Sequence, residues 1–181
     1  LGVREWIDWR VRPGERDMQA IAAEVEARGG LFIIAHPKSK GDPVCTGCDW
    51  RYDEMMPGTA RCVEIWNKGI WNEQNEQGLA LWYSWLNQGY RMVATAGTDV
   101  HGQVPADLRI GFNVIYAEAL EERALLDAIR QGHLYVSSGP QLTLTARNEV
   151  SKTVMMGDTI EDTGVELTCT WDNVAGNLQL R

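Results

Sequence analysis

The sequence predicts an α/β fold followed by a small antiparallel β appendage. Between residues 15 and 131, short apolar runs alternate with segments of helical period, which is the pattern of βα units around a parallel sheet. From residue 141 the helical period is lost, and runs of alternating polar and apolar residues follow between polar turns. We therefore divide the chain into residues 1–140 and residues 141–181.

The first predicted helix covers residues 15–28, whose apolar side chains fall on one helical face, and Gly29 supplies a stop at its end. The run "LFIIA", residues 31–35, is continuously apolar and rich in β-branched residues, as in a strand buried on both faces of a parallel sheet. It ends at His36 and Pro37, because proline cannot continue the hydrogen-bond ladder of a central strand.

The next predicted elements repeat this alternation. The polar segment 38–59 is long for a loop in a compact domain, and such loops are usually functional or mobile. "CVEIW", residues 62–66, is the second predicted strand. A helix follows over residues 73–88, and "RMVATA", residues 91–96, forms the third strand, which ends at a glycine.

"FNVIY", residues 112–116, is the fourth predicted strand. Residues 121–131 form the next helix, with acidic residues at its start and Arg130 near its end, as the helix dipole favours. Gly132 closes it. The appendage that follows ends at Arg181 without an evident closing strand, and we expect it to be truncated there.

Composition excludes several classes of protein. With 181 residues the chain is too short for a complete α/β barrel, which needs about 250. A net charge of −8 argues against a nucleic-acid partner, and no apolar run approaches the roughly 18 residues of a membrane helix. The chain begins at Leu1 without a secretory pattern, so we expect a soluble fragment or processed form whose cellular location stays open.

Two of the four cysteines have a spacing that also occurs in zinc-binding and redox sites. Cys45 and Cys48, in "CTGC", have the spacing of a zinc knuckle or a redox pair, but a zinc site of this type needs a second pair. Cys62 and Cys169 are isolated in the sequence. We favour a local disulfide or two loop thiols over zinc, and a zinc-knuckle module would require one of the isolated cysteines to join the pair.

The strongest chemical signal is the placement of metal-capable side chains at predicted strand ends. His36 follows the first strand, while Asp99 and His101 follow the third, directly after Gly97. The carboxyl ends of parallel strands carry the active sites of α/β proteins, and residues two apart in extended backbone point to the same side. Imidazole and carboxylate are ligands for Zn, Mn or Fe, so these three residues are the predicted metal ligands and catalytic residues.

Four motifs together resemble one known family. "GGLFIIAHP", "CVEIWN", "GTDVH" and "GHLYVSSGP" occur in this order within residues 17–145, and they resemble the polymerase and histidinol phosphatase (PHP) superfamily, in particular its carbaryl-hydrolase-like branch. The resemblance implies a distorted β/α barrel holding two or three divalent metals in a hydrolase site. It makes His36 the ligand of the "AHP" motif, and Asp99 and His101 the ligands of a "GSDAH" motif in which Thr98 replaces serine.

One departure from the family is large. Its members begin with an H-x-H motif, whereas the only histidines here are His36, His101 and His133. We therefore expect the C-terminal portion of the barrel, with an incomplete or empty metal cluster, inactive alone. Its exposed strand edges favour a homo-oligomer or exchange of elements.

Three further residues are candidate substrate contacts: Lys38 and Arg109 as anion binders, and Asn67 at the end of the second strand. Glu64 is interpreted as a strand-end polar residue, and His133 as a helix C-terminal residue. The leading hypothesis is a metal-dependent hydrolase, most naturally a phosphoesterase, that activates water for attack on a small-molecule ester or phosphoester. The alternative is a non-catalytic binding or scaffold module with a degenerate PHP-like barrel.

Overall fold

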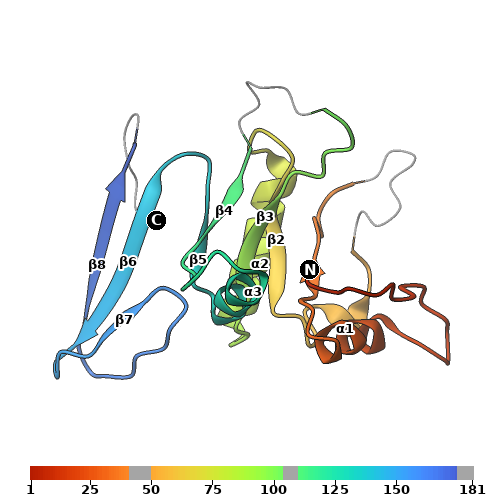
Figure 1. The fold of residues 1–181 in the computed structure, drawn as a ribbon, viewed down its shortest axis with the longest axis horizontal. Helices are drawn as coiled ribbons and strands as arrows, with labels where there is room; N and C mark the ends of the chain where they lie inside the picture. Colours follow the sequence, from red (N-terminus) through yellow and green to blue (C-terminus); the bar gives the residue numbers. More distant parts are fainter. Residues whose placement is uncertain (41–49, 104–109, 175–181) are drawn as a thin grey trace.

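The computed structural model describes residues 1–40, 50–103 and 110–174 (Figure 1). Arg109, Cys45 and Cys48 lie outside these ranges. The elements follow in the order α1 (Met18–Ala27), β1 (Ile33–Ile34), a 3-10 turn (Asp53–Met55), β2 (Cys62–Asn67), α2 (Glu73–Asn87), β3 (Val93–Gly97), β4 (Phe112–Ile115), α3 (Glu122–Gln131), β5 (Leu134–Ser137), β6 (Gln141–Asn148), β7 (Thr153–Met155) and β8 (Val165–Asp172).

A three-stranded parallel sheet organises the first part of the chain. Its order is β1-β2-β3, with Ile34 paired to Val63, and Val63 paired to Ala94. The register between β2 and β3 shifts by one residue between Glu64 and Trp66, as at a β-bulge. Because all three strands run in the same direction, their carboxyl ends form one edge, at the top of Figure 1.

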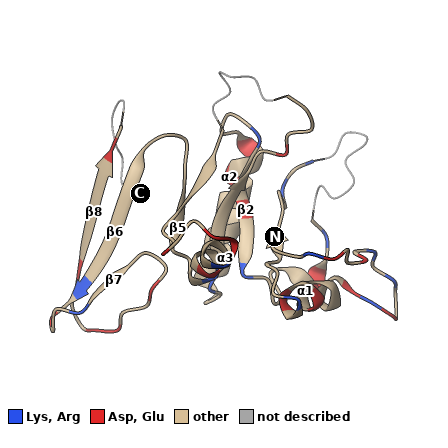
Figure 2. Cartoon of the chain, in the orientation of Figure 1, with Lys and Arg blue, Asp and Glu red and all other residues tan. Residues whose placement is uncertain are grey.

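The main hydrophobic core lies where α1 and α2 pack on this sheet. Val63 and Ile34 are completely buried at its centre, and Trp85 of α2 is 2% exposed. Both of these helices begin at a side-chain cap: Asp17 accepts from the Ala20 backbone N–H at 2.7 Å, and Asn72 accepts from the Asn75 backbone N–H at 3.1 Å. Figure 2 shows acidic residues in the first turn of α2, where the helix dipole favours negative charge. Caps and core together fix the elements that carry the strand ends.

The predicted fourth strand does not join the parallel sheet. β4 pairs antiparallel with β5, a strand that periodicity did not predict, and α3 connects the two. The β4-β5 pair lies beside β3, because the Asn113 side chain exchanges two hydrogen bonds of 2.8 Å with the Ala96 backbone. An amide side chain thus bridges two sheets that, within the described ranges, are not joined by a strand ladder.

The prediction of part of a β/α barrel is therefore wrong. The described residues contain 3 helices and 8 strands in three small sheets, and they form no closed barrel. The physical reason is strand direction. Alternating strand and helix patterns are the same whether the helix returns the chain to a parallel or an antiparallel neighbour, and here α3 leads to an antiparallel one.

The appendage is an antiparallel sheet of order β7-β6-β8. Its contacts to the α/β part are specific. Tyr116 donates a hydrogen bond to the Leu142 carbonyl, and the Leu142 N–H donates to the Tyr135 hydroxyl at 2.9 Å. His133 contacts Asp158, Nε2 to Oδ1, at 2.9 Å. The 140/141 boundary stays a prediction, although β6 starts at residue 141.

None of the helices in the described ranges combines the length and the apolar character that crossing a bilayer requires.

Candidate functional site

Three residues with left-handed backbone stand at the carboxyl edge of the parallel sheet. His36 follows β1 with φ of 29°, Lys68 follows β2 with φ of 67°, and Asp99 follows β3 with φ of 48°. A side-chain-bearing residue pays a conformational cost for positive φ, of order 1–3 kcal/mol for the more strained cases. Such residues cluster at active sites and ligand clamps. One of them at each of three adjacent strand ends marks this edge as the candidate site.

The backbone of His36 is fixed by hydrogen bonds, whereas one nitrogen of its imidazole ring has no partner in the described residues. Its N–H donates to Glu64 Oε2 at 3.0 Å, and its carbonyl accepts from the Ser39 N–H at 3.0 Å. The imidazole Nδ1 is buried, and among the described residues it has no hydrogen-bond partner. A buried polar atom without a partner is costly and calls for an explanation. A ligand bound at Nδ1 would supply one.

Asp99 and His101 contact one another. His101 Nε2 lies 3.1 Å from Asp99 Oδ1, and Lys68 Nζ lies 3.9 Å from Asp99 Oδ2. The His101 side chain is 88% exposed, whereas that of Asp99 is 27% exposed. The pair is therefore at the surface, where an ion pair contributes at most about 1 kcal/mol. Neither residue is locked into the core, and both donor groups face solvent.

Below this surface lies a buried polar network centred on Glu64. Asn67 Nδ2 donates to Glu64 Oε1 at 3.0 Å, and the side chain of Asn75 on α2 exchanges two hydrogen bonds with the Asn67 backbone, at 2.9 and 3.3 Å. Glu64, Asn67 and Asn75 are 8%, 4% and 3% exposed. The network joins β1, β2 and α2 through hydrogen bonds that are all made inside the protein.

The predicted site residues fall into two groups along this edge. His36, Lys38 and Asn67 line one small hollow, together with Glu64 and Asn75. Asp99 and His101 do not line it and form their own surface pair with Lys68. Arg109 lies outside the described residues. His133, interpreted as a helix C-terminal residue, follows the left-handed Gly132 that ends α3 and contacts Asp158.

The predicted metal ligands are donor types that suit a divalent ion, but the described residues do not gather enough of them around one point. The unpartnered Nδ1 of His36 and the adjacent carboxylate and imidazole of Asp99 and His101 are suitable donors. However, the described residues hold no group of three or more His, Cys, Asp or Glu side chains placed to bind one ion. The described part of the chain therefore does not form a complete metal centre.

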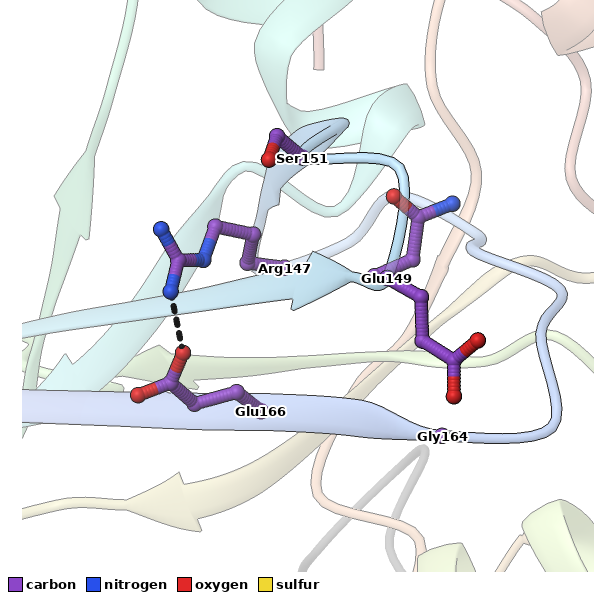
Figure 3. Close-up of a pocket in the computed structure, with 6 residues that line it drawn as sticks. Arg147, Glu149, Ser151, Gly164 and Glu166 are labelled. Carbon is purple, nitrogen blue, oxygen red and sulfur yellow. Dashed lines mark hydrogen bonds and ion pairs between the residues drawn. The ribbon is translucent and has the colours of Figure 1, made fainter.

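Two other hollows lie on the appendage side. The first, shown in Figure 3, is at the end of β6, where Arg147 and Glu166 form an ion pair of 2.8 Å. Both side chains are more than half exposed, so this is an ordinary surface pair. The second is a groove between β4-β5 and β6-β8, lined by aromatic side chains that include Phe112 and Trp171.

Sequence reasoning missed two residues of this edge. Lys68 follows a strand like His36 and Asp99 do, but nothing in the sequence marks its left-handed backbone. Glu64 was interpreted as an ordinary strand-end residue, whereas it links β1 to β2. The only available signal was a carboxylate inside an otherwise apolar strand, since such a group requires partners when it is buried.

Comparison of the chain with protein-family models, curated proteins and solved structures found no match.

Proposed function

We propose that the chain contributes part of the active site of a metal-dependent hydrolase that acts on small-molecule esters, phosphoesters foremost. The observation that carries the proposal is the set of three left-handed, side-chain-bearing residues at adjacent strand ends. Two of them, His36 and Asp99, are metal-capable. We include in this proposal a relationship to the PHP superfamily, which rests on the four sequence motifs. The proposal does not include the closed barrel of that family.

His36, Asp99 and His101 would hold the metal, which we take to be Zn, Mn or Fe, with further ligands from outside the described residues. A bound divalent ion supplies a nucleophilic hydroxide by lowering the pKa of its water, and it stabilises charge that develops on the ester oxygen. The buried, unpartnered Nδ1 of His36 supports its role as a donor, since a bound ion would supply the partner that this atom lacks.

The cationic side chains of this edge would orient an anionic substrate. Lys38 lies near His36 at this edge and would meet a phosphoryl oxygen there as a point charge. Lys68, whose Nζ lies 3.9 Å from Asp99 Oδ2, would place a second positive charge beside such a substrate. Asn67 is less available, because its amide nitrogen already donates to Glu64.

A binding or scaffold module is the second candidate. It is favoured by one observation: the described residues hold no cluster of three metal-capable side chains. In this case the edge would bind a ligand or partner without chemistry.

The test uses the full natural protein with and without Asp99→Ala. Both forms are analysed for bound metal and assayed with chromogenic carboxylic and phosphoric esters. The hydrolase proposal expects metal and turnover in the wild type and a loss of both in the variant. Equal metal content and equal turnover in the two forms would reject Asp99 as a ligand, and a metal-free, inactive wild type would favour the binding module.

A further inference from the structure

One buried carboxylate connects three of the elements that build the candidate site. Glu64 Oε2 accepts from the backbone N–H of His36, which follows β1, and Oε1 accepts from Asn67 at the end of β2. Both distances are 3.0 Å. Charge-assisted hydrogen bonds of this kind are about twice as strong as neutral ones. The carboxylate therefore ties the end of β1 to the end of β2.

The third strand makes room for the same carboxylate. A Cβ atom placed on Gly97, the last residue of β3, would lie 2.4 Å from Glu64 Oε1 and 3.0 Å from its Cδ. Real Cβ atoms essentially never approach other atoms more closely than 3.0 Å. An alanine at position 97 would therefore have to displace the Glu64 carboxylate, which lies against the Gly97 backbone. β3, the strand that leads to Asp99, can lie close to Glu64 because Gly97 has no side chain.

The α2 helix supports the arrangement from the other side. The Asn75 side chain accepts from the Asn67 N–H and donates to the Asn67 carbonyl, as a neighbouring strand would. This fixes the backbone at the residue whose amide meets Glu64. The chain of contacts runs from α2 through Asn75, Asn67 and Glu64 to His36, and every side chain in it except that of His36 is less than 9% exposed.

The hydrogen bond to His36 also bears on its unusual backbone. At φ of 29° His36 occupies a region that costs a side-chain-bearing residue free energy, and such a conformation persists only when the surroundings impose it. The N–H bond to Glu64 and the carbonyl bond from Ser39 hold the backbone on both sides of the His36 Cα atom. The direction of the imidazole depends on this backbone.

We propose that Glu64 is a positioning residue, which sets the backbone and thereby the imidazole of His36 relative to the ends of β2 and β3. Its consequence for catalysis rests on the proposed hydrolase function, but the positioning itself does not. What Glu64 must supply is a pair of hydrogen-bond acceptors in a space that Gly97 leaves open. A glutamine can supply the acceptor for His36, and the Asn67 amide can turn over to meet the glutamine nitrogen. A methionine supplies neither.

The test compares Glu64→Met with Glu64→Gln in the metal-free 181-residue chain. Hydrogen exchange of the His36 amide and the imidazole NMR signals of the three histidines are recorded. In Glu64→Met the His36 amide should exchange about tenfold faster relative to the Val63 amide in the centre of β2, and the His36 imidazole signals should shift while those of His133 stay in place. Glu64→Gln should restore both readouts toward wild type.

A matched control is Glu54→Met, because Glu54 also accepts a hydrogen bond from a backbone N–H, that of Met18, at 3.1 Å. It should speed exchange at Met18 and leave His36 unchanged. If Glu64→Met unfolds the chain, Gly97→Ala provides the second variant, since the added methyl group must displace the carboxylate and should also speed His36 exchange. An unchanged His36 amide in the folded variants, or Glu64→Gln behaving like Glu64→Met, would overturn the proposal.

The same pair of variants in the full natural protein separates the two proposals. Turnover lost in Glu64→Met and retained in Glu64→Gln extends the positioning role to catalysis. A wild-type protein without turnover rejects the hydrolase function and leaves the His36 result standing.

Discussion

Replacement of Gly97 by alanine should destabilise the chain, whereas the same replacement at Gly78 should stabilise it. At position 97 the new methyl group would lie 2.4 Å from Glu64 Oε1. Either the methyl group strains the packing or the carboxylate leaves its hydrogen bonds to His36 and Asn67. Overpacking costs about 1–3 kcal/mol, and the loss of one hydrogen bond to a charged group about 1.5–3 kcal/mol. We therefore expect Gly97→Ala to lose about 2–4 kcal/mol of unfolding free energy.

Gly78 is the matched control because it lies inside α2, with φ in the ordinary helical range. An added Cβ would meet only the Ile65 backbone at 3.6 Å and the Glu64 carbonyl at 3.8 Å, which are ordinary contacts. Alanine is favoured over glycine in a helix interior by about 0.5–1 kcal/mol. Gly78→Ala should therefore raise the unfolding free energy by about that amount.

The assay is urea unfolding followed by the fluorescence of the eight tryptophans. Gly97→Ala is measured in the wild type and in a Glu64→Ala background, where the obstructing carboxylate is absent. The cost of Gly97→Ala should fall by at least about 1 kcal/mol in that background. A cost below about 0.5 kcal/mol in the wild type, or an equal cost in both backgrounds, would refute the contact between Gly97 and Glu64.

Three further outcomes are expected. The hydrogen bond with His133 holds the pKa of Asp158 below its ordinary value of 3.8. The contribution of the ionised Asp158 to stability is therefore complete above pH 3.8 and is lost as the pH falls through the lowered pKa. Between about pH 5 and pH 2 the wild type should lose more unfolding free energy than Asp158→Asn, and equal losses in the two proteins would contradict this. Burial raises the pKa of the Cys62 thiol to about 12. A thiol reagent at neutral pH should therefore modify the half-buried Cys169 in the native chain and reach Cys62 only in urea, as mapped by peptide mass spectrometry. Equal modification rates of the two cysteines in the native chain would show that Cys62 is accessible. Trp85→Ala should cost about 3–5 kcal/mol in the urea assay, because Trp85 is 2% exposed in the main core, and a cost under about 1 kcal/mol would place this side chain outside the core.

The sequence predicts the elements of the α/β part well where periodicity and caps are strong. The helix predicted over 73–88 is found at Glu73–Asn87, and the strand predicted over 62–66 is found at Cys62–Asn67. The first helix was predicted over 15–28 and begins later, at Met18, because the Asp17 side chain caps it. Local signals of this kind do not depend on the rest of the fold.

Strand direction and pairing are not local, and there the prediction failed. The run "LYVS", residues 134–137, directly follows a helix and was not predicted as a strand, although it forms β5. β5 is specified by its antiparallel partner β4 and by the turn of α3 between them. Without β5, the fourth strand was assigned to a parallel sheet, and the resemblance to the PHP superfamily supplied the expectation that this sheet belonged to a barrel.

The candidate site was predicted in its position but not in its construction. His36, Asp99 and His101 lie after β1 and β3, as the sequence indicates. Asp99, however, is left-handed rather than extended, so extended backbone is not what brings Asp99 and His101 into contact. Glu64 lies next to a one-residue register shift, and its carboxylate fills the space that a side chain at position 97 would need. No sequence pattern reports either.

The most direct test of the proposed metal site uses Mn²⁺ as a paramagnetic probe of the three imidazoles. The histidine side-chain signals of the 181-residue chain are recorded while MnCl₂ is added, with MgCl₂ as the diamagnetic control and Asp99→Ala as the ligand variant. We expect the signals of His36 and His101 to broaden at Mn²⁺ concentrations that leave His133 sharp, and Asp99→Ala to weaken this selectivity. Equal broadening of all three histidines, or of none, would contradict a metal site at the carboxyl edge of the parallel sheet.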